Sequence, residues 1–310
     1  MKFGIFTSLT ATDWPSVRSL CEYADGAGWD AACVTDHFMP NTADRVGDVL
    51  EGWTALAALA VVTRRMRIGT IVSGNTYRHP AVLAKMAANI DIISNGRLIC
   101  GIGAAWQENE HRAYGIEFHT TRERLERLEE ACRILKALWT EPRATFHGRH
   151  YRLEDAPLQP KPVQQPHPEL MIGGGGEKVT LKIAARHADH WNVWGGPDTL
   201  AHKNRILDEH CDAVGRDPKT VLRSANMPVA ITNDRGAVEQ MQRTYMRRLG
   251  GDEDKARDTV LGGTVPEVKD KLGRLRAAGV QMLWVPTFFV LGDRRAALEQ
   301  FIVEIAPEFR

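Results

Sequence analysis

The sequence has no hydrophobic run long enough to cross a membrane and no excess of charge of one sign. Its longest apolar stretch, residues 53–62, is about half of the ~20 residues that a transmembrane helix needs. Its 40 basic and 39 acidic residues leave a formal net charge of +1. Such a balance creates no field that would attract nucleic acid or an anionic membrane. We therefore expect small molecules as partners, with no nucleic acid and no membrane.

Cysteine is scarce and forms no recognisable pattern. The five cysteines are scattered along the chain and none forms a C-x-x-C pair, which argues against a disulfide framework and against a zinc signature. We interpret them as reduced core residues, as is usual in the cytoplasm. The first ten residues are too polar for the apolar segment of a signal peptide. We expect a cytoplasmic protein.

Strand-like and helix-like hydrophobic patterns alternate along the whole chain. Eight apolar segments predict strands, and sequence with helical periodicity follows each of them. These segments are 2–7, 31–35, 67–73, 97–103, 169–173, 190–194, 221–231 and 281–286. Alternating strands and helices imply parallel pairing, and eight such units in 310 residues favour an α/β fold of the (β/α)8 TIM barrel type over a doubly wound open sheet. We predict one domain over residues 1–310.

A proline-rich segment interrupts this alternation. Residues 157–169 (PLQPKPVQQPHPE) contain five prolines, and a long helical pattern over about 107–139 precedes them. The alternation resumes immediately afterwards. We therefore predict an insertion before strand 5 of the barrel rather than a linker between domains.

In a (β/α)8 barrel the functional residues lie at the C-terminal ends of the strands. The second predicted strand is followed by Asp36 and His37, and the third by Ser73, Gly74 and Asn75. The strand ends bring no set of several His and Asp residues, so we expect no metal site. They also offer no lysine for a Schiff base.

Four consecutive glycines, Gly173, Gly174, Gly175 and Gly176, join the fifth predicted strand to a helix that we expect to begin near Glu177. Free N–H groups at a helix N-terminus form a concavity that binds anions. Neither the Walker A pattern nor the dinucleotide fingerprint is fulfilled. The segment therefore predicts a site for a ligand with a phosphate tail, and a purely structural turn is the alternative.

The segment Ser73-Gly74-Asn75 also allows two interpretations, one with a bound ligand and one without. Glycine at the end of a strand marks a bulge or the close approach of a ligand. A flat ring system lying against this backbone would explain the sequence, and a bulge without a ligand would also do so.

Five segments together resemble the bacterial-luciferase-like superfamily. They are TDHF (35–38), GTIVSGNTYRHPAVLAK (69–85), GRLICGIGAAWQENEHRAYG (96–115), ERLERLEEACRILKALW (123–139) and IGGGGEKVTLKIAARHADHWN (172–192). They are most similar to those oxidoreductases of the superfamily that use the deazaflavin coenzyme F420, and the similarity continues over 262–280. The resemblance implies a (β/α)8 barrel that usually forms a homodimer.

The resemblance also implies where the cofactor binds. The ring of F420, or of FMN as the alternative, would lie against a bulge with a non-prolyl cis peptide near Val72, Ser73 and Gly74. Asn75 would contact the polar edge of the ring, and Asp36 is counted with the cofactor-binding residues. The N–H groups of Gly174 to Gly176 would bind the ribityl phosphate.

His37 matches a position that contacts the substrate or acts as a base in some members of the superfamily. An imidazole titrates near neutral pH and suits the removal of a hydroxyl proton, so we predict that His37 is catalytic. Orientation of Asp36 or of the backbone is the alternative role. The sugar-phosphate dehydrogenases of the superfamily have a glutamate near the position of Ala104. Its absence argues against that substrate, and we assign no role to Glu108 or Glu110.

We thus predict an oxidoreductase that transfers a hydride between F420 and a small organic substrate. The alternatives are an FMN-dependent monooxygenase and a non-catalytic cofactor-binding barrel. Basic residues could line a groove for the lactyl-glutamate tail of F420; the candidates are Arg78, His79, Lys178 and Arg186. Aromatic residues could line an apolar pocket; the candidates are Phe38, Trp53, Tyr77, Trp106 and Trp194.

Overall fold

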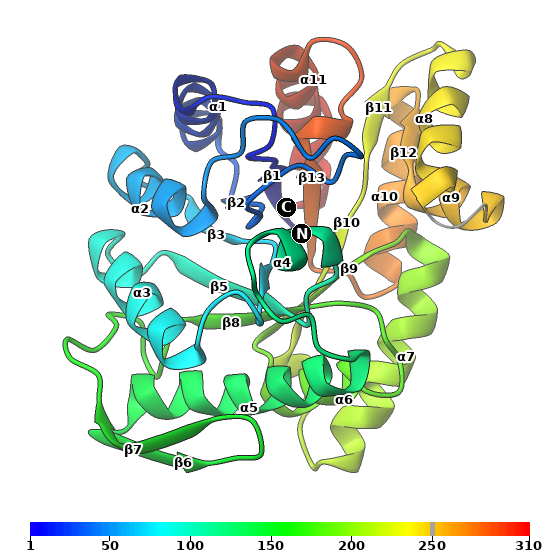
Figure 1. Cartoon of the computed structure of the whole chain (residues 1–310). Helices are drawn as coiled ribbons and strands as arrows, with labels where there is room; N and C mark the ends of the chain where they lie inside the picture. The colour runs from blue at the N-terminus through cyan, green and yellow to red at the C-terminus, as the bar shows by residue number, and fades with distance from the viewer. Residues whose placement is uncertain (249–251) are drawn as a thin grey trace.

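The computed structural model describes residues 1–248 and 252–310, so residues 249–251 of the predicted domain lie outside the described residues. Parallel strands form a closed barrel (Figure 1). Its eight strands are β1 (Lys2–Thr7), β2 (Ala31–Val34), β3 (Arg67–Thr70), β5 (Leu98–Gly103), β8 (Glu169–Gly173), β9 (His190–Trp194), β10 (Leu222–Asn226) and β13 (Met282–Pro286). β1 pairs with both β2 and β13, and β3 pairs with β5, which closes the ring. The predicted (β/α)8 barrel is confirmed.

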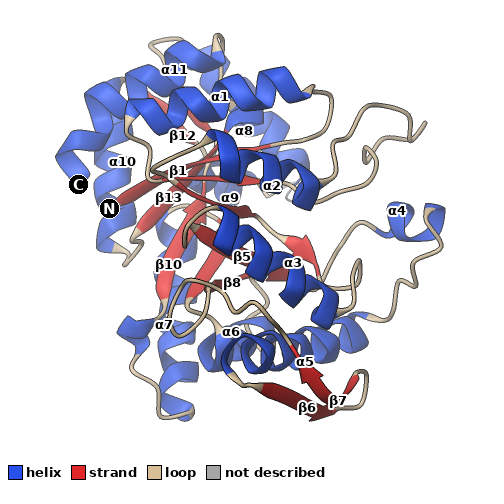
Figure 2. Ribbon diagram, turned by 90° about the vertical axis from the view of Figure 1, so that its left-hand side faces the viewer, coloured by secondary structure: helices blue, strands red, loops and turns tan. Residues whose placement is uncertain are grey.

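The helices surround this barrel on the outside, except for α4, which is drawn at the centre of the ring in Figure 1 and away from the strands in Figure 2. They are α1 (Trp14–Ala27), α2 (Gly52–Val62), α3 (Pro80–Ile93), α4 (Glu108–Ala113), α5 (Thr121–Thr140), α6 (Thr180–His187), α7 (Pro197–Ala213), α8 (Arg235–Arg248), α9 (Glu253–Thr259), α10 (Val265–Ala277) and α11 (Arg294–Gln300). Local sequence explains their ends. Asp13 caps α1 by accepting the N–H of Ser16, and Gly28 ends it at φ 94°, a conformation that favours glycine. Within residues 1–248 and 252–310, no helix combines the length and apolar character needed to span a membrane.

The core has two layers, as expected for strands whose side chains point alternately inward and outward. One layer packs between the strands and the helices. The other fills the barrel and includes Phe6, Met171 and Trp284. The ring of Trp284 occupies the space beside Gly4, where a Cβ would lie 2.4 Å from it. Burial of this kind contributes about 25 cal/mol per Å² of apolar surface.

Three predicted elements are divided in the structure. The predicted strand over 67–73 ends as β3 at Thr70 and resumes as β4 (Ser73–Gly74). The predicted strand over 221–231 breaks at Pro228, which has no N–H for a ladder. Its second part, β11 (Val229–Ile231), pairs instead with β12 (Leu261–Gly263) in a separate sheet. The helical pattern over 107–139 divides into α4 and α5, with Gly115 at φ 67° between them.

The insertion before the fifth barrel strand contains a hairpin that the sequence analysis did not predict. Strands β6 (Arg143–His147) and β7 (Arg152–Pro157) pair antiparallel and lie along α5 (Figure 2). Glu130 of α5 accepts backbone N–H groups from the turn of the hairpin. The proline-rich segment then returns the chain to β8.

Candidate active site

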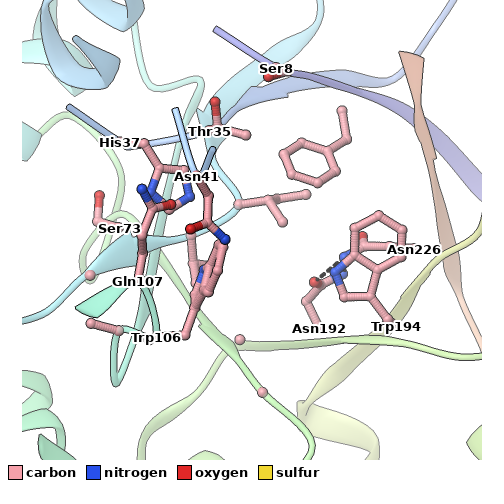
Figure 3. Close-up of a pocket in the computed structure, with 18 of the residues that line it drawn as sticks. Ser8, Thr35, His37, Asn41, Ser73, Trp106, Gln107, Asn192, Trp194 and Asn226 are labelled. Atoms are coloured by element: carbon pink, nitrogen blue, oxygen red, sulfur yellow. Dashed lines mark hydrogen bonds between the residues drawn. The ribbon is translucent and has the colours of Figure 1, made fainter. Parts of the chain in front are cut away.

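A cavity of about 890 Å³ opens at the C-terminal ends of the barrel strands (Figure 3). It is large enough for a cofactor ring and a small substrate together. Most of its wall comes from strand ends and from the loops that follow them. These lining residues include Phe6, Thr35, His37, Val72, Ser73, Gly74, Gly103, Trp106, Gly173, Gly174, Gly175, Thr180, Asn192, Trp194, Asn226 and Phe288.

A bulge after β3 forms one side of this cavity. The peptide bond between Ile71 and Val72 is cis, at the place where the resemblance implied one, and the chain then rejoins the sheet as β4 (Ser73–Gly74) beside β5. The side chain of Val72 lies against Gly103 and Gly173, where a Cβ would come within 2.8 and 2.9 Å of it. The first of the four glycines therefore makes room for the bulge itself.

The remaining glycines form a loop that is tied to its surroundings mainly through carbonyl oxygens. Trp191 Nε1 donates to the Gly174 carbonyl at 2.8 Å, and Lys203 Nζ donates to the Gly175 carbonyl at 2.7 Å. Gly174 has φ +134°, which a side chain would disfavour. Within the described residues, the N–H groups of Gly175 and Gly176 have no hydrogen-bond partner. They are available to an anion.

The helix after this loop begins later than the sequence suggested. α6 starts at Thr180 rather than near Glu177, and Thr180 lines the cavity together with Gly173, Gly174 and Gly175. Gly176 is not among the lining residues. The sequence analysis missed Thr180, although a threonine in the turn after a glycine run is a recognisable donor for phosphate.

His37 faces the cavity and is held from behind by Glu110. Glu110 Oε1 lies 2.8 Å from His37 Nδ1, and Oε2 accepts the N–H of Phe38 at 2.9 Å. The hydroxyl of Tyr77 also donates to Glu110. Because an ionised carboxylate only accepts hydrogen bonds, Nδ1 must carry a proton, and Nε2 of the neutral ring is then an acceptor. This arrangement leaves a basic nitrogen for a ligand in the cavity.

The electrostatics keep Glu110 ionised. Burial raises the pKa of Glu110, but hydrogen bonds from His37, Phe38 N–H and Tyr77 outweigh it, so the pKa is below its ordinary value. Burial and the bond to Glu110 raise the pKa of Tyr77, which therefore remains a donor. We assigned Glu110 no role from sequence, because only the fold brings it to His37 across 73 positions.

Two predicted cofactor residues lie behind the cavity wall. Asp36 pairs with Arg78 at 2.7 and 3.1 Å, and neither residue is among those that line the cavity. Asn75 is also outside the lining set. Its Nδ2 lies 3.4 Å from the Tyr151 hydroxyl, while its Oδ1 is buried without a partner. Asn75 thus retains an unused acceptor, whereas the contacts of Asp36 are those of an ion pair.

The basic and aromatic residues that the sequence suggested for the groove and the pocket lie only partly at the cavity. None of the four basic residues Arg78, His79, Lys178 and Arg186 lines it. Of the five aromatic candidates, Tyr77, Trp106 and Trp194 do, and Phe38 and Trp53 do not. Trp53 instead donates from Nε1 to Ser73 Oγ at 2.7 Å and so supports the bulge from outside.

A pair of asparagines forms the opposite polar wall of the cavity (Figure 3). Asn192 and Asn226 exchange two hydrogen bonds of 3.0 Å each, and Asn192 Nδ2 also donates to Ser224 Oγ at 2.9 Å. Behind them His190 lies between Ser224 and Glu169. The sequence analysis assigned no role to either asparagine.

Among the residues that the structure describes, no three His, Cys, Asp or Glu side chains gather where they could hold a metal ion together. The cavity can instead hold a flat ring against Val72, an anion at the glycine loop and a proton donor beside His37. These are the parts of a site for a ring cofactor and a second molecule that exchanges a proton.

Comparison with known proteins gives relatives that use two different cofactors. An F420-dependent glucose-6-phosphate dehydrogenase of Kineococcus radiotolerans is 35% identical over 68% of this chain and 62% of that protein. An FMNH2-dependent dimethylsulfone monooxygenase of Pseudomonas putida is 32% identical over 64% of this chain and 53% of that protein. The chain thus aligns with somewhat less than two thirds of the length of these relatives.

Solved structures share the fold over the whole chain. The coenzyme F420-dependent tetrahydromethanopterin reductase of Methanopyrus kandleri matches with a TM-score of 0.84 at 19% identity, covering 100% of this chain and 99% of that one. The family model described as luciferase-like monooxygenase matches residues 1–302. The chain therefore belongs to the luciferase-like monooxygenase family.

Proposed function

We propose that this protein is an F420-dependent oxidoreductase that transfers a hydride between the deazaflavin and a small organic substrate. The observation that carries the proposal is the position of His37: its Nδ1 is held by the ionised Glu110, and Nε2 is left for the cavity. Relatives at 30–35% identity that bear F420-dependent names agree with it.

The residues present fit the cofactor in three places. Val72 offers an apolar surface for a ring. Asn75 lies behind the cavity wall with a buried, unpartnered Oδ1, and a ring N–H could donate to this oxygen once the side chain turns toward the cavity. The N–H groups of Gly175 and Gly176, with the hydroxyl of Thr180, could hold the phosphate. When bound, the deazaflavin supplies a carbon that accepts or donates the hydride.

The charge around the glycine loop favours F420 over FMN. The phosphate of F420 is a diester with one negative charge, whereas the monoester of FMN has nearly two. Lys203, which contacts the Gly175 carbonyl, already pairs with Glu177 at 2.8 Å, so a bound phosphate would meet mainly backbone N–H groups. Such a site neutralises one charge better than two.

The chain's own residues then move one proton. His37 Nε2 accepts the hydroxyl proton of an alcohol substrate, or returns a proton to the oxygen of a carbonyl in the reverse direction. Glu110 stabilises the resulting imidazolium and fixes the ring, and Tyr77 holds Glu110 in turn. The ring of Trp106 lies edge-on to that of His37, with centroids 5.4 Å apart.

The test is to titrate the purified protein in parallel with F420 and with FMN, following intrinsic fluorescence. Tighter binding of F420 is expected. Selective binding of FMN would favour the alternative, an FMN-dependent monooxygenase. Binding of F420 without turnover of any alcohol or carbonyl compound would favour the second alternative, a non-catalytic cofactor-binding barrel.

Two further expectations belong to the same proposal. The five cysteines are all unpaired and buried, which supports a reducing compartment such as the cytoplasm.

Association as a homodimer follows from the resemblance to the superfamily, and sedimentation of the purified protein would test it.

A further inference from the structure

The cavity has a wall that the proposed cofactor site does not use. The bulge and the glycine loop belong to β3, β5 and β8, on one side of the barrel mouth. The rest of the mouth, formed by β1, β9 (which pairs directly with β8), α8 and the turn after β13, carries a cluster of aromatic rings. We call it the aromatic wall; its members are Phe6, Trp194, Tyr245, Phe288 and Phe289.

The rings of this wall contact one another as a continuous surface. The ring of Phe6 lies edge-on to that of Phe288, with centroids 5.3 Å apart. The centroids of the Phe6 and Trp194 rings are 6.0 Å apart. The centroid of the Tyr245 ring lies 5.6 Å from the ring centroids of both Trp194 and Phe289. A surface of this kind binds a ring by edge and face contacts.

The cavity is also unusual in its lack of charge. Within the described residues, none of the side chains that line it is a lysine, arginine, aspartate or glutamate. The titratable groups of the lining are His37, Tyr77 and Tyr245. The described lining residues thus offer no cation to a phosphate or carboxylate on a substrate, and the loss of water from an anion without such a partner is strongly unfavourable.

Three cations near the cavity, among the side chains that the structure describes, are already engaged elsewhere. Arg78 pairs with Asp36 and Glu51, and Lys203 with Glu177. Arg124 donates to the carbonyl oxygens of Ala104 and His119. Recruiting any of them for an anionic substrate would break existing contacts.

We infer that the substrate is a neutral alcohol or carbonyl compound that carries an aromatic or alicyclic ring, and not a phosphorylated sugar. The ring lies against the aromatic wall and the oxygen points to His37. The redox step rests on the proposed function: the C–H bond of the alcohol carbon breaks with its electron pair passing as hydride to F420, the hydroxyl proton passes to His37 Nε2, and a ketone forms.

Binding rather than turnover provides the test. We would titrate the F420-loaded protein with 1-phenylethanol, acetophenone and glucose 6-phosphate, using calorimetry and saturation-transfer NMR. Saturable binding of the first two is expected, with no saturable binding of the sugar phosphate. Trp194→Leu should weaken 1-phenylethanol at least tenfold and change F420 affinity less than twofold. Tyr114→Leu, an aromatic residue outside the cavity, serves as the matched control and should change neither.

Binding of glucose 6-phosphate, unchanged affinity for 1-phenylethanol in Trp194→Leu, or no binding of either neutral probe would each overturn the inference. Failure of the proposed function would be seen separately, as failure of F420 to bind. In that case the same probes, titrated into the protein without cofactor, still test the aromatic wall. Circular dichroism of both variants confirms that they are folded.

Discussion

Two pairs of histidine and glutamate in this barrel, each with one buried and one half-buried member, have the same chemistry and different surroundings. At the mouth, His37 Nδ1 lies 2.8 Å from Glu110; inside the barrel, His190 Nδ1 lies 2.7 Å from Glu169. In both carboxylates burial raises the pKa, and hydrogen bonding to the histidine is among the effects that bring it below the ordinary value.

The difference lies in the second ring nitrogen. His190 Nε2 contacts Ser224 Oγ at 2.6 Å, and Glu169 also pairs with Arg67, so that every member of the inner pair has its partners within the protein. His37 Nε2 is left for the cavity. The inner pair therefore stabilises the fold, and the outer pair is available for proton transfer.

The largest effect is expected for His37→Ala. Loss of a positioned base lowers kcat/KM by about 10²–10⁴, equivalent to about 3–5 kcal/mol in the barrier. The free energy of unfolding should change by less than about 1 kcal/mol, because His37 lies at the edge of the cavity. Steady-state kinetics and urea unfolding measure the two effects. A rate within threefold of the wild type would contradict the assigned role.

Glu169→Ala should show the opposite pattern. It leaves Arg67 without its buried carboxylate, and breaking such a pair costs about 3–5 kcal/mol of stability. Urea unfolding checks this, with Glu169→Gln as the control that retains shape without charge and should lose less. The folded fraction of both variants should keep its turnover rate. A variant as stable as the wild type would mean that the inner pair does not stabilise the barrel.

Acid should remove the stability that the inner pair provides. The pKa of Glu169 is held at about 2, because contacts with His190 and Arg67 outweigh the effect of burial. A lowered pKa in the folded state contributes stability that is fully present above the ordinary value of 4.5 and is lost as the pH falls towards 2. The loss is on the order of 3 kcal/mol. Urea unfolding between pH 5 and pH 2.5 should therefore show a steeper decline for the wild type than for Glu169→Gln.

The smallest effect is expected for Glu110→Gln. The amide still accepts from His37 Nδ1 but no longer supplies the charge that stabilises an imidazolium. A charge-assisted hydrogen bond exceeds a neutral one by about 1 kcal/mol, so kcat should fall about fivefold. KM should be nearly unchanged, since the cavity wall is not altered. An unchanged kcat would show that Glu110 only positions the loop.

The sequence predicted the barrel because strand patterns and helix patterns alternate eight times with little interruption. It did not predict the β6–β7 hairpin, whose outward residues are charged and whose packing on α5 depends on long-range contacts such as those of Glu130. It placed one strand across Pro228, where the missing N–H breaks the ladder.

The candidate site was likewise predicted where it depends on local sequence and missed where it depends on long-range contacts. Residues at strand ends, such as His37, Ser73 and the glycines, could be located from strand order alone. Glu110, Thr180 and Asn192 could not, because their roles arise from contacts with residues far away in the sequence. The glycines were explained only in part: Gly173 makes room for Val72, a packing requirement that no local pattern reveals.

The most direct measurement of the central claim is the protonation of the His37 ring, by ¹⁵N NMR of the imidazole nitrogens at pH 8 with His37→Gln for assignment. The account predicts a proton on Nδ1 and a bare Nε2, whose resonance shifts when an alcohol probe enters the F420-loaded cavity. The His190 resonances should remain unchanged. A bare Nδ1 with a protonated Nε2 would contradict the account, because His37 could then not take a proton from the cavity.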